Sequence, residues 1–132
     1  MKTHDNTVST ELNFLVVDDS TSMRRIIRRV ITDMGCGEVY EAHTAQEAWT
    51  LLQDKPVDFI VCDWNMPGMK GIDFLSKIRD TERFCSLPFL MVSAESKTDN
   101  IFEAIQSGVS NYLTKPFTPD ILQQKIQAII KQ

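Results

Sequence analysis

Short apolar runs alternate with amphipathic stretches five times along the 132 residues, and this alternation limits the possible folds more than any other feature. The runs are rich in β-branched and aromatic residues, which predicts buried β-strands. Strands are expected at residues 14–17, 39–42, 58–62, 89–92 and 111–113. Apolar residues recur at helical spacing within residues 23–34, 45–52, 72–78, 101–105 and 121–130. Strands that are apolar throughout are covered on both faces, as in a parallel sheet between helices.

This order of elements predicts an α/β fold, a doubly wound sheet of five parallel strands with right-handed crossovers. A chain of this length can bury a sufficient core as one domain, which we expect to span residues 13–132. Residues 1–12 are mostly polar and are expected to form a flexible tail. Ligands of such sheets bind beyond the carboxyl ends of the strands, so functional residues should stand directly after each strand.

The composition argues against nucleic-acid binding and membrane insertion. The 14 basic and 18 acidic residues give a net charge of −4, whereas nucleic-acid-binding proteins usually have a basic face. No apolar run approaches the roughly 20 residues of a membrane span, and the N terminus contains no stretch that resembles a signal peptide. The widely spaced Cys36, Cys62 and Cys85 form no metal-binding motif. We therefore expect a reduced, cytoplasmic domain.

The helix expected within residues 23–34 combines an apolar stripe with four arginines. The stripe, which includes Met23, Ile26, Ile27 and Val30, is interpreted as core. The arginines are interpreted as a solvated face; they are Arg24, Arg25, Arg28 and Arg29.

Charged and hydroxyl side chains follow four of the predicted strands. They are Asp18, Asp19, Asp63, Ser93 and Lys115. Taken singly, each is also compatible with a capping or turn residue, and only their joint occurrence indicates a site. Three carboxylates at one rim repel each other unless a cation lies among them. Oxygen ligands without neighbouring cysteine or histidine favour Mg²⁺, and a lysine and a hydroxyl suit phosphoryl oxygens.

Two other classes of doubly wound protein fit the sequence less well. A flavin-binding domain needs a loop after the first strand whose amides bind phosphate, but here that loop opens with two aspartates. A hydrolase that works through an aspartyl-phosphate would carry a second acid two residues after Asp63, where this chain has Asn65. A domain that accepts a phosphoryl group on a carboxylate fits best. A phosphatase or phosphotransferase that acts through an aspartyl-phosphate is kept as an alternative.

Four segments of the sequence resemble bacterial two-component response-regulator receiver domains. They are LVVDD at residues 15–19, DWNMPGMKG at 63–71, MVSAE at 91–95 and YLTKPF at 112–117. The resemblance extends from about residue 14 to the C terminus, and it is strongest to stand-alone receivers that act in chemotaxis. It implies a flavodoxin-like sheet with strand order 2-1-3-4-5. It also implies a phosphoprotein that catalyses only its own phosphorylation and dephosphorylation.

The resemblance implies a role for each acid of the site. Asp63 would accept the phosphoryl group from a histidine kinase. Asp19, Asp63 and the backbone carbonyl of Asn65 would bind Mg²⁺, and Asp18 would act on the ion through water. Asn65 would also affect the lifetime of the phosphorylated state, together with Ala94 and Glu95.

The remaining motif residues would bind the phosphoryl group and transmit its presence. Lys115 and Ser93 would hold phosphoryl oxygens, and a cis Lys115–Pro116 bond would let the lysine reach the site. Tyr112 would be the switch residue, whereas the sequence alone, without the resemblance, predicts a half-buried strand aromatic at this position. The partner face would comprise Lys97, Ile101, Tyr112, Ile121 and Lys125.

The partners implied are a chemotaxis-type histidine kinase, the flagellar motor switch protein and a phosphatase, and the receiver is expected to be a monomer. The alternative within the same family is a stand-alone receiver of a phosphorelay or of a pathway unrelated to motility.

Overall fold

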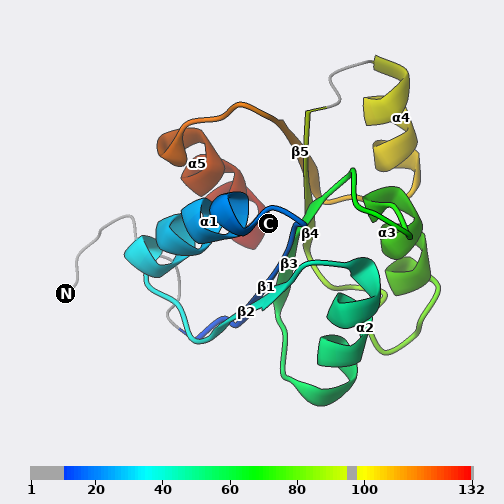
Figure 1. Ribbon diagram of the computed structural model, residues 1–132, viewed down its shortest axis with the longest axis horizontal. Helices are drawn as coiled ribbons and strands as arrows, with labels where there is room; N and C mark the ends of the chain where they lie inside the picture. Colours follow the sequence, from blue (N-terminus) through cyan, green and yellow to red (C-terminus); the bar gives the residue numbers. More distant parts are fainter. Residues whose placement is uncertain (1–10, 95–97, 132) are drawn as a thin grey trace.

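The computed structural model describes residues 11–94 and 98–131, in which five parallel strands form one sheet with the order β2-β1-β3-β4-β5. This order confirms the predicted fold. The strands are β1 (Phe14–Val17), β2 (Val39–Ala42), β3 (Phe59–Asp63), β4 (Phe89–Ser93) and β5 (Asn111–Thr114). The helices are α1 (Thr21–Met34), α2 (Ala45–Asp54), α3 (Gly71–Arg79), α4 (Thr98–Gln106) and α5 (Pro119–Ile130). Helices α1 and α5 cover one face of the sheet, and α2, α3 and α4 lie on the other (Figure 1).

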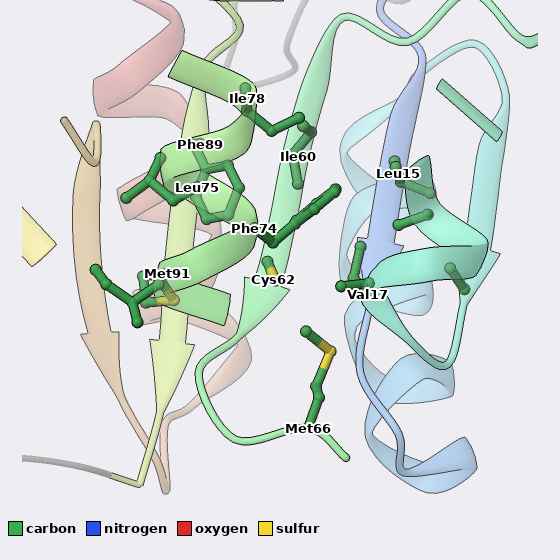
Figure 2. Close-up of a cluster of buried hydrophobic side chains, with 14 of the residues drawn as sticks. Leu15, Val17, Ile60, Cys62, Met66, Phe74, Leu75, Ile78, Phe89 and Met91 are labelled. Carbon is green, nitrogen blue, oxygen red and sulfur yellow. The ribbon is translucent and has the colours of Figure 1, made fainter. Parts of the chain in front are cut away.

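Side chains of the central strands alternate between two hydrophobic layers. Leu15, Ile60 and Phe89 are paired across β1, β3 and β4 and belong to the layer under α2 and α3, which Figure 2 shows. The next row, which includes Val16 and Val61, belongs to the layer under α1 and α5. Both rows are fully buried, which explains why the strands are apolar throughout.

Hydroxyl side chains define where three helices begin. Ser20, Thr44 and Thr118 are the N-caps of α1, α2 and α5, and each accepts a hydrogen bond from a backbone amide three residues later. Such a cap satisfies one of the free amides of the first turn. The caps of α1 and α5 fix the start of a helix close to a predicted site residue.

Two interpretations of α1 need correction. Ile26, assigned to the core, is 46% exposed, because the buried stripe is centred on Ile27, Ile31 and Met34 and Ile26 lies at its edge. The four arginines are not all solvated: the side chain of Arg24 is only 15% exposed and pairs with Glu41 on β2.

Arg79 at the end of α3 connects three segments far from the site residues. Its Nε donates to the carbonyl of Gly108 at 2.8 Å, and its Nη1 donates to the carbonyls of Leu87 and Cys85 at 2.7 and 3.1 Å. Gly108 has φ of 95°, and an added Cβ would lie 3.2 Å from Nε. Arg79 therefore fixes the entry to β4 and the turn between α4 and β5.

No helix among the described residues combines the length and apolar character needed to span a membrane. The predicted tail falls mostly outside the described residues, as do Glu95 and Lys97.

Candidate functional site

The carboxyl ends of β1 and β3 bring the three predicted acids together. One carboxylate oxygen from each of Asp18, Asp19 and Asp63 lies within 4.8 Å of the others. Asp18 and Asp63 are buried, whereas Asp19 is exposed. Strands β3 and β4 each end one residue later than predicted, because sheet pairing continues to Asp63–Val92 and Ser93–Thr114. Asp63 and Ser93 are therefore the last residues of their strands and do not follow them.

Lys115 brings a positive charge to this acidic cluster. Its Nζ lies 3.1 Å from Asp18 Oδ2 and 3.4 Å from Asp63 Oδ1. Its backbone amide donates to the carbonyl of Ser93 at 2.7 Å, so the ends of β4 and β5 are joined beside the acids. The Lys115–Pro116 bond is cis, as predicted. One ammonium thus compensates for part of the charge of two buried carboxylates.

The environment raises the pKa of three groups at this rim. Burial, and next the negative charge of Asp18, raise the pKa of Asp63 to about 6, although Lys115 opposes the shift. Burial alone would lower the pKa of Lys115, but the carboxylates of Asp63 and Asp18 raise it, so the amine stays protonated. Burial, followed by Asp63 and Asp18, raises the pKa of the Cys62 thiol well above its ordinary value. Cys62 therefore remains a neutral thiol at neutral pH.

The backbone holds the two buried aspartates in place. The amide of Asp18 donates to the carbonyl of Ala42 at 3.1 Å, and the amide of Ser20 donates to Asp18 Oδ1 at 2.9 Å. Helix α3 begins so close to the end of β3 that a Cβ on Gly71 would lie 2.2 Å from the carbonyl oxygen of Asp63. Only glycine permits this approach, a constraint that the spacing of the motif residues did not reveal.

One aromatic contact connects Tyr112, the predicted switch residue, to the site. The rings of Tyr112 and Trp64 meet edge-on with centroids 6.4 Å apart, and Trp64 directly follows Asp63. Tyr112 is half-buried on β5. This contact could not be predicted from the sequence, because the two rings lie 48 positions apart and β4 lies between β5 and the strand that Trp64 follows.

The predicted partner face is formed by α4, β5 and α5. Ile121 is 42% exposed, and Lys125 Nζ lies 3.5 Å from Asn111 Oδ1. Two further apolar side chains of α4 were not predicted here, Phe102 at 58% and Ile105 at 60% exposed. A shallow hollow between α4 and β5 is lined by Ile101, Ile105, Val109, Ser110, Asn111, Tyr112 and Thr114.

Comparison with known proteins agrees with this fold and site. The response regulator receiver domain model matches residues 14–127. The chemotaxis protein CheY of Pseudomonas aeruginosa is 46% identical over 121 residues, which cover 92% of this chain and 98% of that protein. Chemotaxis protein CheY-3 of Vibrio cholerae is 43% identical, with 92% and 93% covered. The solved structure of CheY4 of Vibrio cholerae superposes with a TM-score of 0.84 at 32% identity and covers 91% of this chain and 99% of that one.

The chain therefore belongs to the response regulator receiver domain family. It is similar to chemotaxis proteins CheY in particular. A receiver domain of this type is a signalling protein and not a classical enzyme. A receiver domain implies a histidine kinase as partner.

Proposed function

We propose that this receiver accepts a phosphoryl group on Asp63 from a cytoplasmic histidine kinase of the CheA type and then binds the flagellar motor switch protein. The observation that carries the proposal is the position of Lys115, whose ammonium lies between the carboxylates of Asp18 and Asp63. The similarity to CheY proteins of two bacteria supports chemotaxis as the pathway.

In the proposed reaction, one carboxylate oxygen of Asp63 attacks the phosphorus of a phosphohistidine. The phosphorus–nitrogen bond breaks, and the imidazole of the kinase keeps the electron pair. Lys115 holds one phosphoryl oxygen and Ser93 another. Catalysis of this kind depends on positioning and on electrostatic stabilisation of charged oxygens.

The donor set at the rim fits Mg²⁺. Three carboxylates converge within 4.8 Å, and the neighbouring Cys62 thiol is held in the neutral form that does not bind metal ions. We assign Asp19, Asp63 and the backbone carbonyl of Asn65 as ligands, with Asp18 acting through water. Bound Mg²⁺ would supply positive charge opposite the oxygens of the transferred group.

Transfer from a kinase tests the acceptor role directly. A CheA-type kinase labelled with radioactive phosphate on its histidine is mixed with the purified protein and Mg²⁺, and the label is followed by gel electrophoresis. We expect the label to move to this chain in at most one equivalent. Sustained release of phosphate from generic phosphomonoesters would favour the enzyme alternative. A strain that lacks the gene but swims and responds normally would favour a pathway other than motility.

The bound phosphate is expected to be short-lived. Asn65 and Ala94 are exposed beside Asp63 and Ser93, and small or polar side chains there leave a path for water. We expect Ala94→Leu to lengthen the half-life of the labelled protein after removal of the phosphodonor. Loss of label is timed in EDTA-free buffer, with Ala128→Leu on the exposed side of α5 as control. A wild-type phosphate that persists for hours at neutral pH would contradict this expectation.

A further inference from the structure

Arg24 differs from the other arginines of α1 because its guanidinium lies under the turn that carries Asp18 and Asp19. Its Nη1 donates to the backbone carbonyl of Asp18 at 2.6 Å. Its Nε pairs with Glu41 Oε1 at 3.1 Å, and its Nη2 lies 3.2 Å from Thr21 Oγ1. The three nitrogens of the guanidinium are thus bound to the turn after β1, to β2 and to the first residue of α1.

The carbonyl bound by Arg24 belongs to the peptide unit that joins Asp18 to Asp19. The carboxylate of Asp18 is held independently by Ser20 and Lys115. The carboxylate of Asp19 is exposed and forms no hydrogen bond or ion pair with the residues at 11–94 and 98–131. The direction in which Asp19 points therefore depends on the orientation of the peptide unit behind it.

We propose that Arg24 is a positioning residue of the metal site. It fixes the peptide unit between Asp18 and Asp19, so that Asp19 faces Asp63 before a cation binds, and Glu41 holds the guanidinium in place. The inference rests on the proposed Mg²⁺ site. It goes beyond that site because it assigns a function to a residue that contacts neither the ion nor the phosphoryl group.

The sign of the effect separates positioning from simple electrostatics. Arg24 is a cation behind a cation site, so by Coulomb repulsion alone its removal would strengthen Mg²⁺ binding. If Arg24 positions a ligand, its removal weakens binding, because the cation must then order the turn itself. Groups that orient metal ligands typically contribute about 10- to 100-fold to affinity.

The chain provides a matched control for this test. Arg28 also pairs with Glu41, at 2.7 Å, and it lies on the same helix, but its other hydrogen bond goes to Val39 and not to Asp18. Arg24→Met and Arg28→Met remove the same charge and disturb the same partner. They differ in the contact with the Asp18 carbonyl.

Mg²⁺ is titrated into the metal-free proteins, and the fluorescence of Trp64 is recorded in a Trp49→Phe background. We expect Arg24→Met to weaken Mg²⁺ affinity about 10-fold, Arg24→Lys to weaken it less, and Arg28→Met to leave it unchanged or slightly stronger. Hydrogen exchange of the Ser20 amide in metal-free protein should accelerate in Arg24→Met and not in Arg28→Met. This second measurement needs neither metal nor phosphorylation.

Unchanged or stronger Mg²⁺ binding by a folded Arg24→Met variant would overturn the inference. Equal weakening by Arg28→Met would also overturn it, because the effect would then not depend on the contact with the Asp18 carbonyl. If Arg24→Met does not fold, Glu41→Gln releases the guanidinium without removing it, and unaltered Ser20 exchange there would refute the positioning role. Failure of the wild-type protein to bind Mg²⁺ would instead count against the proposed function.

Discussion

Asp63→Asn is expected to abolish labelling of the protein by acetyl phosphate, whereas the wild-type protein should incorporate at most one equivalent. An amide lacks the anionic oxygen that attacks phosphorus, and Asp18, the other buried acid of the site, is already bound by Lys115 and Ser20. Labelling is measured by mass spectrometry under denaturing conditions. Asp54→Asn, at a carboxylate 77% exposed outside the site, is the matched control and should label normally. Labelling of Asp63→Asn at the wild-type rate would exclude Asp63 as the acceptor.

The same variant is expected to be more stable than the wild type in metal-free buffer at pH 8. The folded-state pKa of Asp63 is raised to about 6, so ionisation is less favourable in the folded than in the unfolded chain. The favourable contribution of the protonated group is complete below its unfolded pKa of 3.8 and is lost as the pH rises through 6. We expect the variant to gain about 1 kcal/mol in free energy of unfolding, a figure that already includes the reduction by solvent screening at the rim.

Urea denaturation at pH 8 and pH 4 measures this difference. The gain in free energy of unfolding should be larger at pH 8, and Mg²⁺ should reduce it by stabilising the wild type. A gain that is equal at both pH values would show that the carboxylate charge is not its cause.

Loading the site with beryllofluoride, which stands in for the phosphoryl group on Asp63, is expected to raise affinity for a motor-switch peptide about 5- to 150-fold. Phosphorylation adds about two negative charges that need new hydrogen bonds. Lys115 is already in place, whereas Ser93 is neutral and fully buried at the end of β4. Movement of Ser93 toward the phosphoryl group is expected to make room for Tyr112 to turn inward on the adjacent strand.

Ser93→Ala should therefore lower the ratio of the two affinities toward one, with little change in the affinity of the unloaded protein. Fluorescence anisotropy of the labelled peptide measures both values, and Ser107→Ala, directly after the end of α4, is the control. Equal peptide affinity in the loaded and unloaded wild type would contradict the switch. A Ser93→Ala variant that responds like the wild type would remove Ser93 from it.

The fold and the acidic site were predictable because they depend on local patterns. Apolar runs such as residues 14–17 are buried on both faces, and the convergence of Asp18 and Asp63 follows from parallel strands ending at one edge. Arg24 was not distinguishable from Arg25 within a run of similar residues, since its role depends on a carbonyl and on Glu41 from another strand. Side-chain contacts between distant segments leave no periodic signal in a sequence.

The exposed apolar residues of α4 were difficult to predict for a related reason. Phe102 and Ile105 recur at helical spacing, which ordinarily indicates burial, yet the sheet beneath α4 is contacted by Ala104 instead. Periodicity shows that a helix has an apolar side, but it does not show whether a neighbour covers that side.

The guanidinium of Arg79 holds the C-terminal end of helix α4 in place. Because one side chain binds the carbonyls of Cys85, Leu87 and Gly108, the far end of α4 is fastened to α3 and to the start of β4. A displacement that begins at Ser93 enters α4 at the opposite end. Helix α4 is therefore expected to rotate about its C-terminal end, with the largest displacement at its first turn and almost none at Gly108. Phosphorylation at Asp63 would thereby tilt the predicted partner face about one end, while the hydrophobic layers on both sides of the sheet keep their packing.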